Sequence, residues 1–223
     1  EINNQKQAAE PEQITIPNSL KYPLIYAGPR KPSQEQFRPV RKRQPRYYGF
    51  EDPKPEGGLW TSFASKEDIN VGEWQLYCDK EMPSWNEYKL RGSWHIVPNE
   101  DCKILEFKNI DDVRPYIRTS RNPRNPCSDF ELEQGVRDYW NDAGNPLYID
   151  YAAMSKDYDV FIFPEDAGER NPLFGDWTRS GYVMNLDKVK VMENEEYAQF
   201  RKSELQKFGA KISNGYELDK LNL

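Results

Sequence analysis

Short hydrophobic runs, each bounded by polar residues, glycine or proline, recur along this chain of 223 residues. The runs are rich in β-branched and aromatic side chains, which is typical of strands. Each run is too short for a long buried helix. The runs predict strands at residues 24–28, 58–63, 93–97, 103–107, 159–163, 181–185 and 189–192.

Helical patterns are fewer and fall irregularly between these strands. Ser128 and Glu131 form a capping box in front of an amphipathic stretch that Gly144 ends. A terminal helix is predicted from about residue 194 to residue 208, with Gly209 as its stop. Because strands and helices do not alternate as βαβ units, the sequence predicts an α+β fold with a few short helices.

Two stretches show no periodic pattern. Residues 1–22 are polar, which favours an extended arm, and residues 29–55 carry six prolines among many charges. We therefore predict a single α+β domain over residues 23–192, in which residues 29–55 form a long basic loop. A C-terminal helix and tail follow over residues 193–223.

Composition adds two constraints. Hydrophobic residues make up 37% of the chain and charged residues 30%, yet aromatic residues reach 13%. Disordered chains are poor in aromatic residues, so a core built largely from rings is expected. The net charge of −6 argues against a general nucleic-acid coat. A basic cluster could still meet phosphates, an acidic partner or a membrane surface, or be a solvated loop; it consists of Arg38, Arg41, Lys42, Arg43 and Arg46.

The cysteines Cys78, Cys102 and Cys127 lack the CxxC spacing, and His95 is the only histidine. No metal site of the usual zinc type is therefore expected, and a reducing compartment is favoured. His95 lies inside a predicted strand and is interpreted as structural. No hydrophobic run approaches the ~20 residues that cross a bilayer. A cytoplasmic or virion-associated protein is expected; because the chain begins at Glu1 without Met, secretion stays an alternative.

The most informative stretch is Lys-Pro-Glu-Gly-Gly-Leu-Trp-Thr-Ser-Phe at residues 54–63. Strand alternation directs Trp60 and Ser62 to one face and Thr61 to the other. An indole beside a hydroxyl can stack on a flat ring and hydrogen-bond its polar edge. The simpler interpretation is a Gly-Gly turn that enters a strand whose Trp is core, and the residues alone favour it.

Carboxylates gather after the predicted strand at residues 159–163. Glu165, Asp166 and Glu169 follow that strand, and Asp176 comes a few residues later. Loops at strand ends often carry catalytic groups, although an acidic surface loop is the more common explanation of such a cluster.

Five motifs follow one another along the chain: Tyr-x-Gly at residues 26–28, the Gly-Gly-Leu-Trp-Thr-Ser run at 57–62, Trp-x-x-Tyr-Cys at 74–78, Tyr-Asp-Val-x-Ile at 158–162, and a Trp-containing segment that ends in Asn at residue 185. Their order resembles that of the small ADP-ribosyltransferase-like proteins of bacteriophages and bacteria. The similarity covers roughly residues 24–192, and residues 57–62 are its most specific part.

The resemblance implies a split pair of packed, mainly antiparallel sheets with NAD bound as substrate in the cleft, without a metal. It implies that the residues that bind NAD are Tyr26, Gly28, Arg30, Trp60 and Thr61.

The resemblance also implies a catalytic set of Ser62 with Asp176 or Glu169 as the carboxylate. Cleavage of the nicotinamide bond creates oxocarbenium character, which a nearby carboxylate stabilises. Two positions depart from the family pattern. Ala27 stands where an Arg or His is expected, and Arg179 stands where an acidic residue is expected.

Two classes of function follow, and whether the chain is an enzyme stays open between them. It is either an ADP-ribosyltransferase that acts on an unidentified acceptor, or a catalytically inactive assembly protein such as a virion component. Both predict a protein partner or acceptor, contacted in the second case through the arm and the loops. Nucleic acid is disfavoured as a partner.

Overall fold

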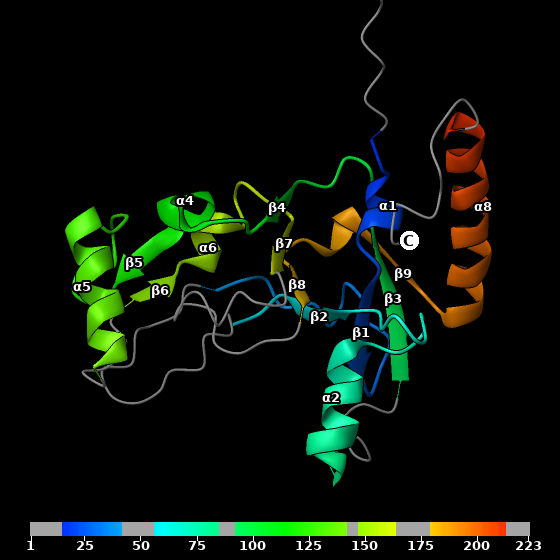
Figure 1. Cartoon of the computed structure of the whole chain (residues 1–223), viewed down its shortest axis with the longest axis horizontal. Coiled ribbons are helices and arrows are strands. Elements are labelled where there is room, and N and C mark those ends of the chain that lie inside the picture. Colours follow the sequence, from blue (N-terminus) through cyan, green and yellow to red (C-terminus); the bar gives the residue numbers. More distant parts are fainter. Residues whose placement is uncertain (1–14, 42–55, 85–91, 142–146, 164–178, 213–223) are drawn as a thin grey trace, which may run out of the picture.

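A curled seven-stranded sheet forms the centre of the computed structural model, which describes residues 15–41, 56–84, 92–141, 147–163 and 179–212 (Figure 1). Its strand order is β4-β7-β8-β2-β1-β3-β9. All neighbours pair antiparallel except β4 and β7, which are parallel. The strands are β1 (Leu24–Gly28), β2 (Leu59–Phe63), β3 (Gly92–Pro98), β4 (Ile104–Glu106), β7 (Val160–Phe163), β8 (Ser180–Val183) and β9 (Val189–Met192).

A second sheet has only two strands, β5 (Ile117–Thr119) and β6 (Leu147–Ile149), and the hydrophobic pattern did not predict it. The helices are α1 (Asn18–Lys21), α2 (Glu73–Glu81), α4 (Ile110–Val113), α5 (Asp129–Trp140), α6 (Tyr151–Met154) and α8 (Asn194–Ile212), and two 3₁₀ turns cover Arg114–Tyr116 and Leu186–Lys188. The α+β class, the mostly antiparallel sheet and the short helices are confirmed.

Two elements differ from the sequence prediction. The last residues of the predicted arm form α1, and Leu20 in it is 1% exposed in a cluster with Phe208 of α8. The terminal helix continues through Gly209 to Ile212, so this glycine does not end it. The capping box at the start of α5 is present, since Ser128 N donates to the Glu131 carboxylate at 2.8 Å.

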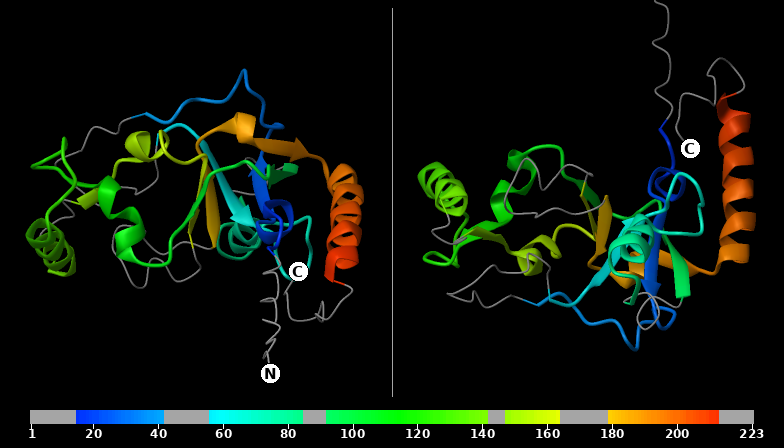
Figure 2. Two further views of the ribbon diagram at one scale, coloured as in Figure 1. Left: turned by 90° about the horizontal axis from the view of Figure 1, so that it is seen from above. Right: turned by 60° about the horizontal axis from the view of Figure 1, so that its bottom comes forward.

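Side chains alternate across the large sheet, and each face has its own core. One core lies beneath β5, β6 and α6 and contains Phe161, Phe163 and Tyr182. The core on the opposite face contains Phe63 and Ile96. Figure 1 shows α5 with the small sheet at one end of the molecule and α8 at the other, and Figure 2 shows the curl of the sheet from two further sides.

The large sheet is nearly divided between β1 and β2. These strands pair at only two positions, Leu24 with Phe63 and Ile25 with Ser62. By contrast, β1 pairs with β3 over five positions, and β2 pairs with β8 over four. Beyond the two shared positions, therefore, β1 pairs only with β3, and β2 pairs only with β8. We call the separation between the two strands the β1/β2 opening.

Candidate functional site

The Gly-Gly turn predicted from the sequence is a fixed junction at the start of β2. Gly57 and Gly58 have φ values of 79° and 64°, a region in which L side chains are strained. A Cβ on Gly57 would overlap the Pro39 carbonyl oxygen. Gly58 N donates to Arg38 O at 2.7 Å, and Tyr182 Oη donates to Gly57 O at 3.0 Å. The turn thus holds the segment around Arg38, which follows β1, against the start of β2.

Three arginines lie at the open end of the β1/β2 opening. The strands run antiparallel and are joined near Ile25 and Ser62, so the end of β1 and the start of β2 lie at the open end. The segment that leaves β1 and returns to β2 there carries Arg30, Arg38 and Arg41, all exposed. None of the three forms an ion pair with another residue in the described part of the chain.

Trp60 lies beside the opening and is partly buried. Its ring packs against Phe163, at a centroid distance of 5.2 Å, and against Tyr182, at 5.9 Å. One side of the Trp60 ring is therefore part of the core, while another part of the side chain remains at the surface.

The two predicted hydroxyls are buried at the closed end of the opening. Thr61 is 2% exposed, and its Oγ1 donates to Gly181 O at 2.7 Å. Ser62 is 3% exposed and lies directly opposite Ser180 of β8. Gly72 lies over Ser62, because a Cβ on this glycine would be 2.5 Å from the Ser62 Oγ. The Ser62 hydroxyl is therefore covered.

Tyr26 lies on the other face of the sheet from Trp60, as their separate cores show. Its ring centroid is 6.1 Å from that of Trp94, and burial raises the pKa of its hydroxyl. A Cβ on Gly28 would lie 2.5 Å from the Tyr26 Oη, so this glycine lets the ring fold over the strand end.

The structure thus brings together only part of the set that the resemblance implied. Trp60 and Ser62 share one face, Tyr26 and Thr61 share the other, and Arg30 lies beyond the strand end.

The two candidate carboxylates, Glu169 and Asp176, lie outside the described residues. The strands that flank their segment are described, however. Phe163 at the end of β7 pairs with Ser180 at the start of β8, which in turn pairs with Ser62. The segment that carries both carboxylates therefore starts and finishes beside the closed end of the opening.

Of the two positions that depart from the family pattern, Arg179 borders the closed end, whereas Ala27 lies on the part of β1 that no longer pairs with β2. The Arg179 guanidinium lies 3.8 Å from the centroid of the Phe63 ring, and Arg179 O accepts from Phe63 N at 3.0 Å. Ala27 is half-buried on β1, opposite Ser93.

Sequence reasoning missed the role of Gly72 and the pairing of Ser62 with Ser180. Both contacts join residues that are distant in the sequence, and they depend on strand register, for which a single sequence gives no direct signal.

His95 has a structural environment away from the opening. It is 0% exposed, its Nε2 lies 3.1 Å from Asn70 Oδ1, and its ring stacks on Tyr197 at a centroid distance of 3.7 Å. Burial, and secondly the positive charge of Arg201, lower the pKa of His95 to about 4.

Within the described residues, no group of three or more His, Cys, Asp or Glu side chains is placed to hold a metal ion. In the same part of the chain, no helix combines the length and the apolar character that a membrane span requires. No protein-family model, curated protein or solved structure matches the chain. Function is therefore inferred from the geometry of the chain itself.

Proposed function

We propose that this chain binds NAD along the β1/β2 opening and transfers ADP-ribose from it to an acceptor. The separation of β1 from β2 after two paired positions supports this most directly. Where two neighbouring strands separate within one sheet, the backbone and side-chain groups of both strands can contact a ligand. Ligand sites favour such breaks in the regularity of a sheet.

The charge at the open end suits the pyrophosphate of a dinucleotide. Arg30, Arg38 and Arg41 are exposed there, and guanidinium groups bind phosphate oxygens in a bidentate manner. Arg38 is fixed through its carbonyl, which accepts from Gly58 N at 2.7 Å. Such fixation reduces the entropy lost when a ligand is bound.

The opposite end suits the nicotinamide ribose. At a rise of about 3.3 Å per residue, Ser62 lies about 13 Å from Gly58 along β2, and Trp60 lies between them. The nicotinamide ring would stack on the accessible part of Trp60. Because Gly72 covers Ser62, we assign Ser62 a positioning role beside Ser180 rather than direct contact with NAD.

The proposed reaction replaces one bond at the ribose C1 atom by another. The bond to nicotinamide breaks, and nicotinamide leaves with the electron pair. A nucleophilic atom of the acceptor then bonds to C1 and loses its proton to a carboxylate. That carboxylate, which also stabilises the oxocarbenium character, would be Asp176 or Glu169. Both belong to the segment whose ends meet beside Ser62.

A fluorescence titration with NAD tests the proposal. We expect NAD to quench the fluorescence of the unmodified chain saturably. The affinity for NAD should be at least tenfold lower in Trp60→Phe, which keeps an aromatic ring in the core but removes the indole. Trp74→Phe on α2 is the matched control and should bind as the unmodified chain does. Arg38→Gln should weaken binding about five- to tenfold, as expected for one charge-assisted hydrogen bond, whereas Lys80→Gln should not. No saturation at millimolar NAD would refute the proposal.

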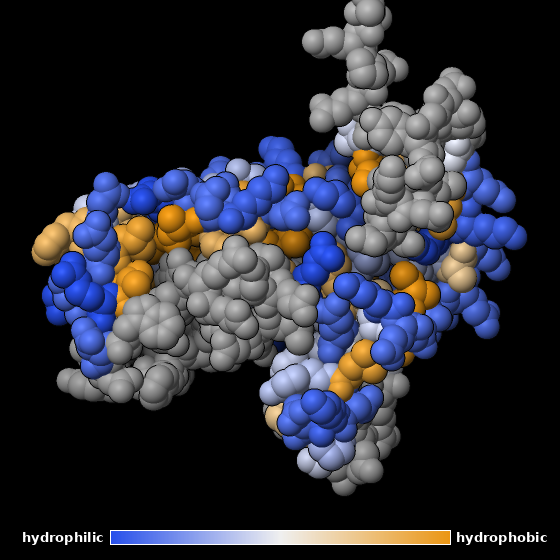
Figure 3. All heavy atoms as spheres, viewed as in Figure 1, coloured by the Kyte–Doolittle hydropathy of each residue, from blue (hydrophilic) through white to orange (hydrophobic). Residues whose placement is uncertain are grey.

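Exposed aromatic side chains favour a second function, that of an assembly subunit. Phe130 is 71% exposed, Tyr77 is 44% exposed, and Tyr77 stacks on Trp74 at a centroid distance of 5.3 Å. Apolar side chains are visible on α2 and toward the α5 end of the molecule (Figure 3). If this function holds, light scattering should detect self-association that Tyr77→Ser or Phe130→Ser weakens, without any NAD binding.

A further inference from the structure

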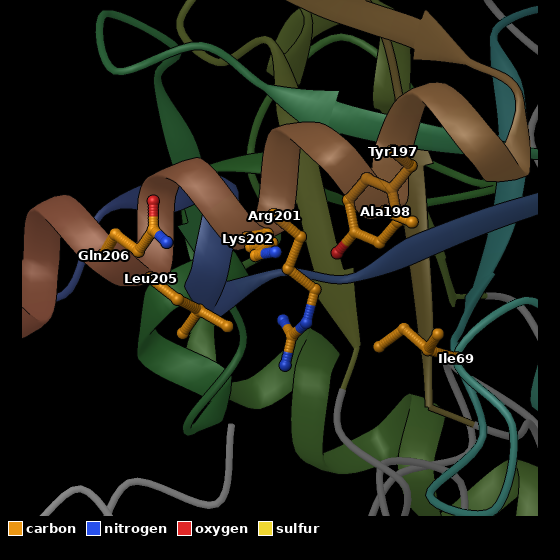
Figure 4. A pocket seen from close by; sticks show the side chains of 7 residues that line it. All are labelled: Ile69, Tyr197, Ala198, Arg201, Lys202, Leu205 and Gln206. Atoms are coloured by element: carbon orange, nitrogen blue, oxygen red, sulfur yellow. The ribbon is translucent and has the colours of Figure 1, made fainter.

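An open pocket of about 450 Å³ lies between α8 and the loop that follows β2 (Figure 4). Its helical wall includes Tyr197, Arg201 and Leu205, which are four residues apart and therefore share one face of α8. Lys202 borders the same wall, and Ile69 of the loop lies opposite. The volume lies within the range of small-molecule sites in proteins.

The loop wall is held in place by hydrogen bonds. Ser65 N donates to Val71 O at 2.7 Å, which closes the loop at its base. Asn70 is bound to β3 twice: its carbonyl accepts from Ser93 Oγ at 3.1 Å, and its Oδ1 lies 3.1 Å from His95 Nε2. These hydrogen bonds fix the position of the loop relative to α8, so the pocket is formed before any ligand binds.

The floor of the pocket contains a buried hydroxyl whose proton has no acceptor. Tyr197 is 1% exposed, and the Arg201 guanidinium, which can only donate, lies beside its Oη; within the described structure the Tyr197 hydroxyl proton has no acceptor. An unsatisfied buried polar atom is costly, so it signals a missing partner. In Figure 4 the Tyr197 hydroxyl points along α8 toward Arg201, that is, toward the pocket.

The charge of the pocket is positive. Arg201 and Lys202 form no ion pair with any carboxylate in the described ranges. Asp68 precedes Ile69 in the loop, but its Oδ1 accepts from Asn70 N at 2.9 Å within the loop itself. Apolar surface comes from Ile69 and from Leu205.

We propose that this pocket binds a small organic anion, a phosphate or carboxylate that carries an apolar group. The anion lies against Arg201 and Lys202, and one of its oxygens accepts a hydrogen bond from Tyr197 Oη. The apolar group packs between Ile69 and Leu205. The site is separate from the β1/β2 opening and does not depend on the proposal that NAD binds there.

The single histidine of the chain allows a direct test by NMR. The imidazole of His95 stacks on Tyr197 at 3.7 Å, so its ring resonances report on the pocket. We expect phenyl phosphate and benzoate to shift them saturably, and neutral benzyl alcohol to leave them unchanged. Inorganic phosphate alone should bind at least tenfold more weakly than phenyl phosphate, because it lacks the apolar group.

Three variants sharpen the test. Arg201→Gln should weaken phenyl phosphate binding at least tenfold, and Tyr197→Phe, which keeps the ring stacked on His95, about threefold or more. Lys207→Gln is the control, because Lys207 is exposed on the same helix and pairs with Glu204 at 2.7 Å; its affinity should not change. The absence of a saturable shift, an equal response to benzyl alcohol, or an unchanged affinity in Arg201→Gln would each overturn the proposal.

Discussion

Lowering the pH from 8 to 5 should destabilise the fold through one residue, His95. This imidazole is 0% exposed, and its Nε2 lies 3.1 Å from Asn70 Oδ1. Burial and the charge of Arg201 lower its pKa from 6.5 to about 4, and the nearby Asn194 and Asp68, which act in the opposite direction, do not offset them. The native state therefore resists protonation over a pH range in which the unfolded chain accepts a proton.

The sign and the size of the effect follow from linkage. Above pH 6.5 the imidazole is neutral in both states, so this residue causes no pH dependence. Between pH 6.5 and 4 the unfolded state binds more protons, and the free energy of unfolding falls as the pH falls. The slope approaches about 1.4 kcal/mol per pH unit. With the pKa of about 4, the loss between pH 8 and pH 5 amounts to about 2 kcal/mol.

Urea unfolding at several pH values between 5 and 8 measures this loss, and NMR titration of the imidazole gives its native pKa directly. No other histidine contributes, and the lower limit of pH 5 keeps most carboxylates ionised. In His95→Gln the slope should vanish, whatever the overall stability of that variant. A native pKa near 6.5, or an equal slope in His95→Gln, would refute the reasoning.

Three substitutions and one thiol reaction test the packing further. In urea unfolding, Gly57→Ala should lower the free energy of unfolding by about 2–3 kcal/mol, because it strains a positive φ and displaces the neighbouring segment. Gly209→Ala should raise it by about 0.5–1 kcal/mol, because alanine favours the helix and its Cβ meets open space. Thr61→Val should cost about 1–2 kcal/mol through the lost hydrogen bond to Gly181 O. Cys102 is buried, with a pKa raised to about 12, so it should react with a thiol reagent only after denaturant is added.

The strands of the large sheet could be predicted because each one is a hydrophobic run between residues that break strands. β7 (Val160–Phe163), for example, is buried along its whole length and precedes Pro164. The small sheet could not be predicted in this way. β5 and β6 have three residues each, too few to show an alternating pattern. Their pairing follows from the packing of the core beneath them.

The same distinction applies to the glycines. Gly57 and Gly58 follow Pro55 and precede a strand, which predicts a turn, and both have a positive φ. Gly209 lies at the end of a periodic stretch, and the sequence pattern therefore predicts that the helix ends there. The helix continues because this glycine does not adopt a positive φ, and a glycine inside a helix costs only about 1 kcal/mol. Local sequence specifies the turn, whereas the end of the helix depends on context.

Of the candidate site, sequence alternation predicted the faces of Trp60, Thr61 and Ser62 correctly. It could not predict the β1/β2 opening. The two strands are separated by residues 29–58, and the number of positions at which they pair is set by the curl of the whole sheet. The cover over Ser62 likewise comes from Gly72, a contact made by the tertiary fold.

One loop connects the two proposed sites and determines whether they communicate. Gly72 lies over Ser62 beside the opening, and Ile69 lines the pocket against α8. Coupling between two ligands requires an element with two arrangements whose balance both ligands shift. This loop is held by hydrogen bonds from Ser65 and Asn70, so one arrangement should dominate. We therefore expect saturating phenyl phosphate to change the affinity for NAD by less than about threefold, a coupling below about 1 kcal/mol. A larger change would mean that the loop moves, and that Ser62 becomes uncovered when it does.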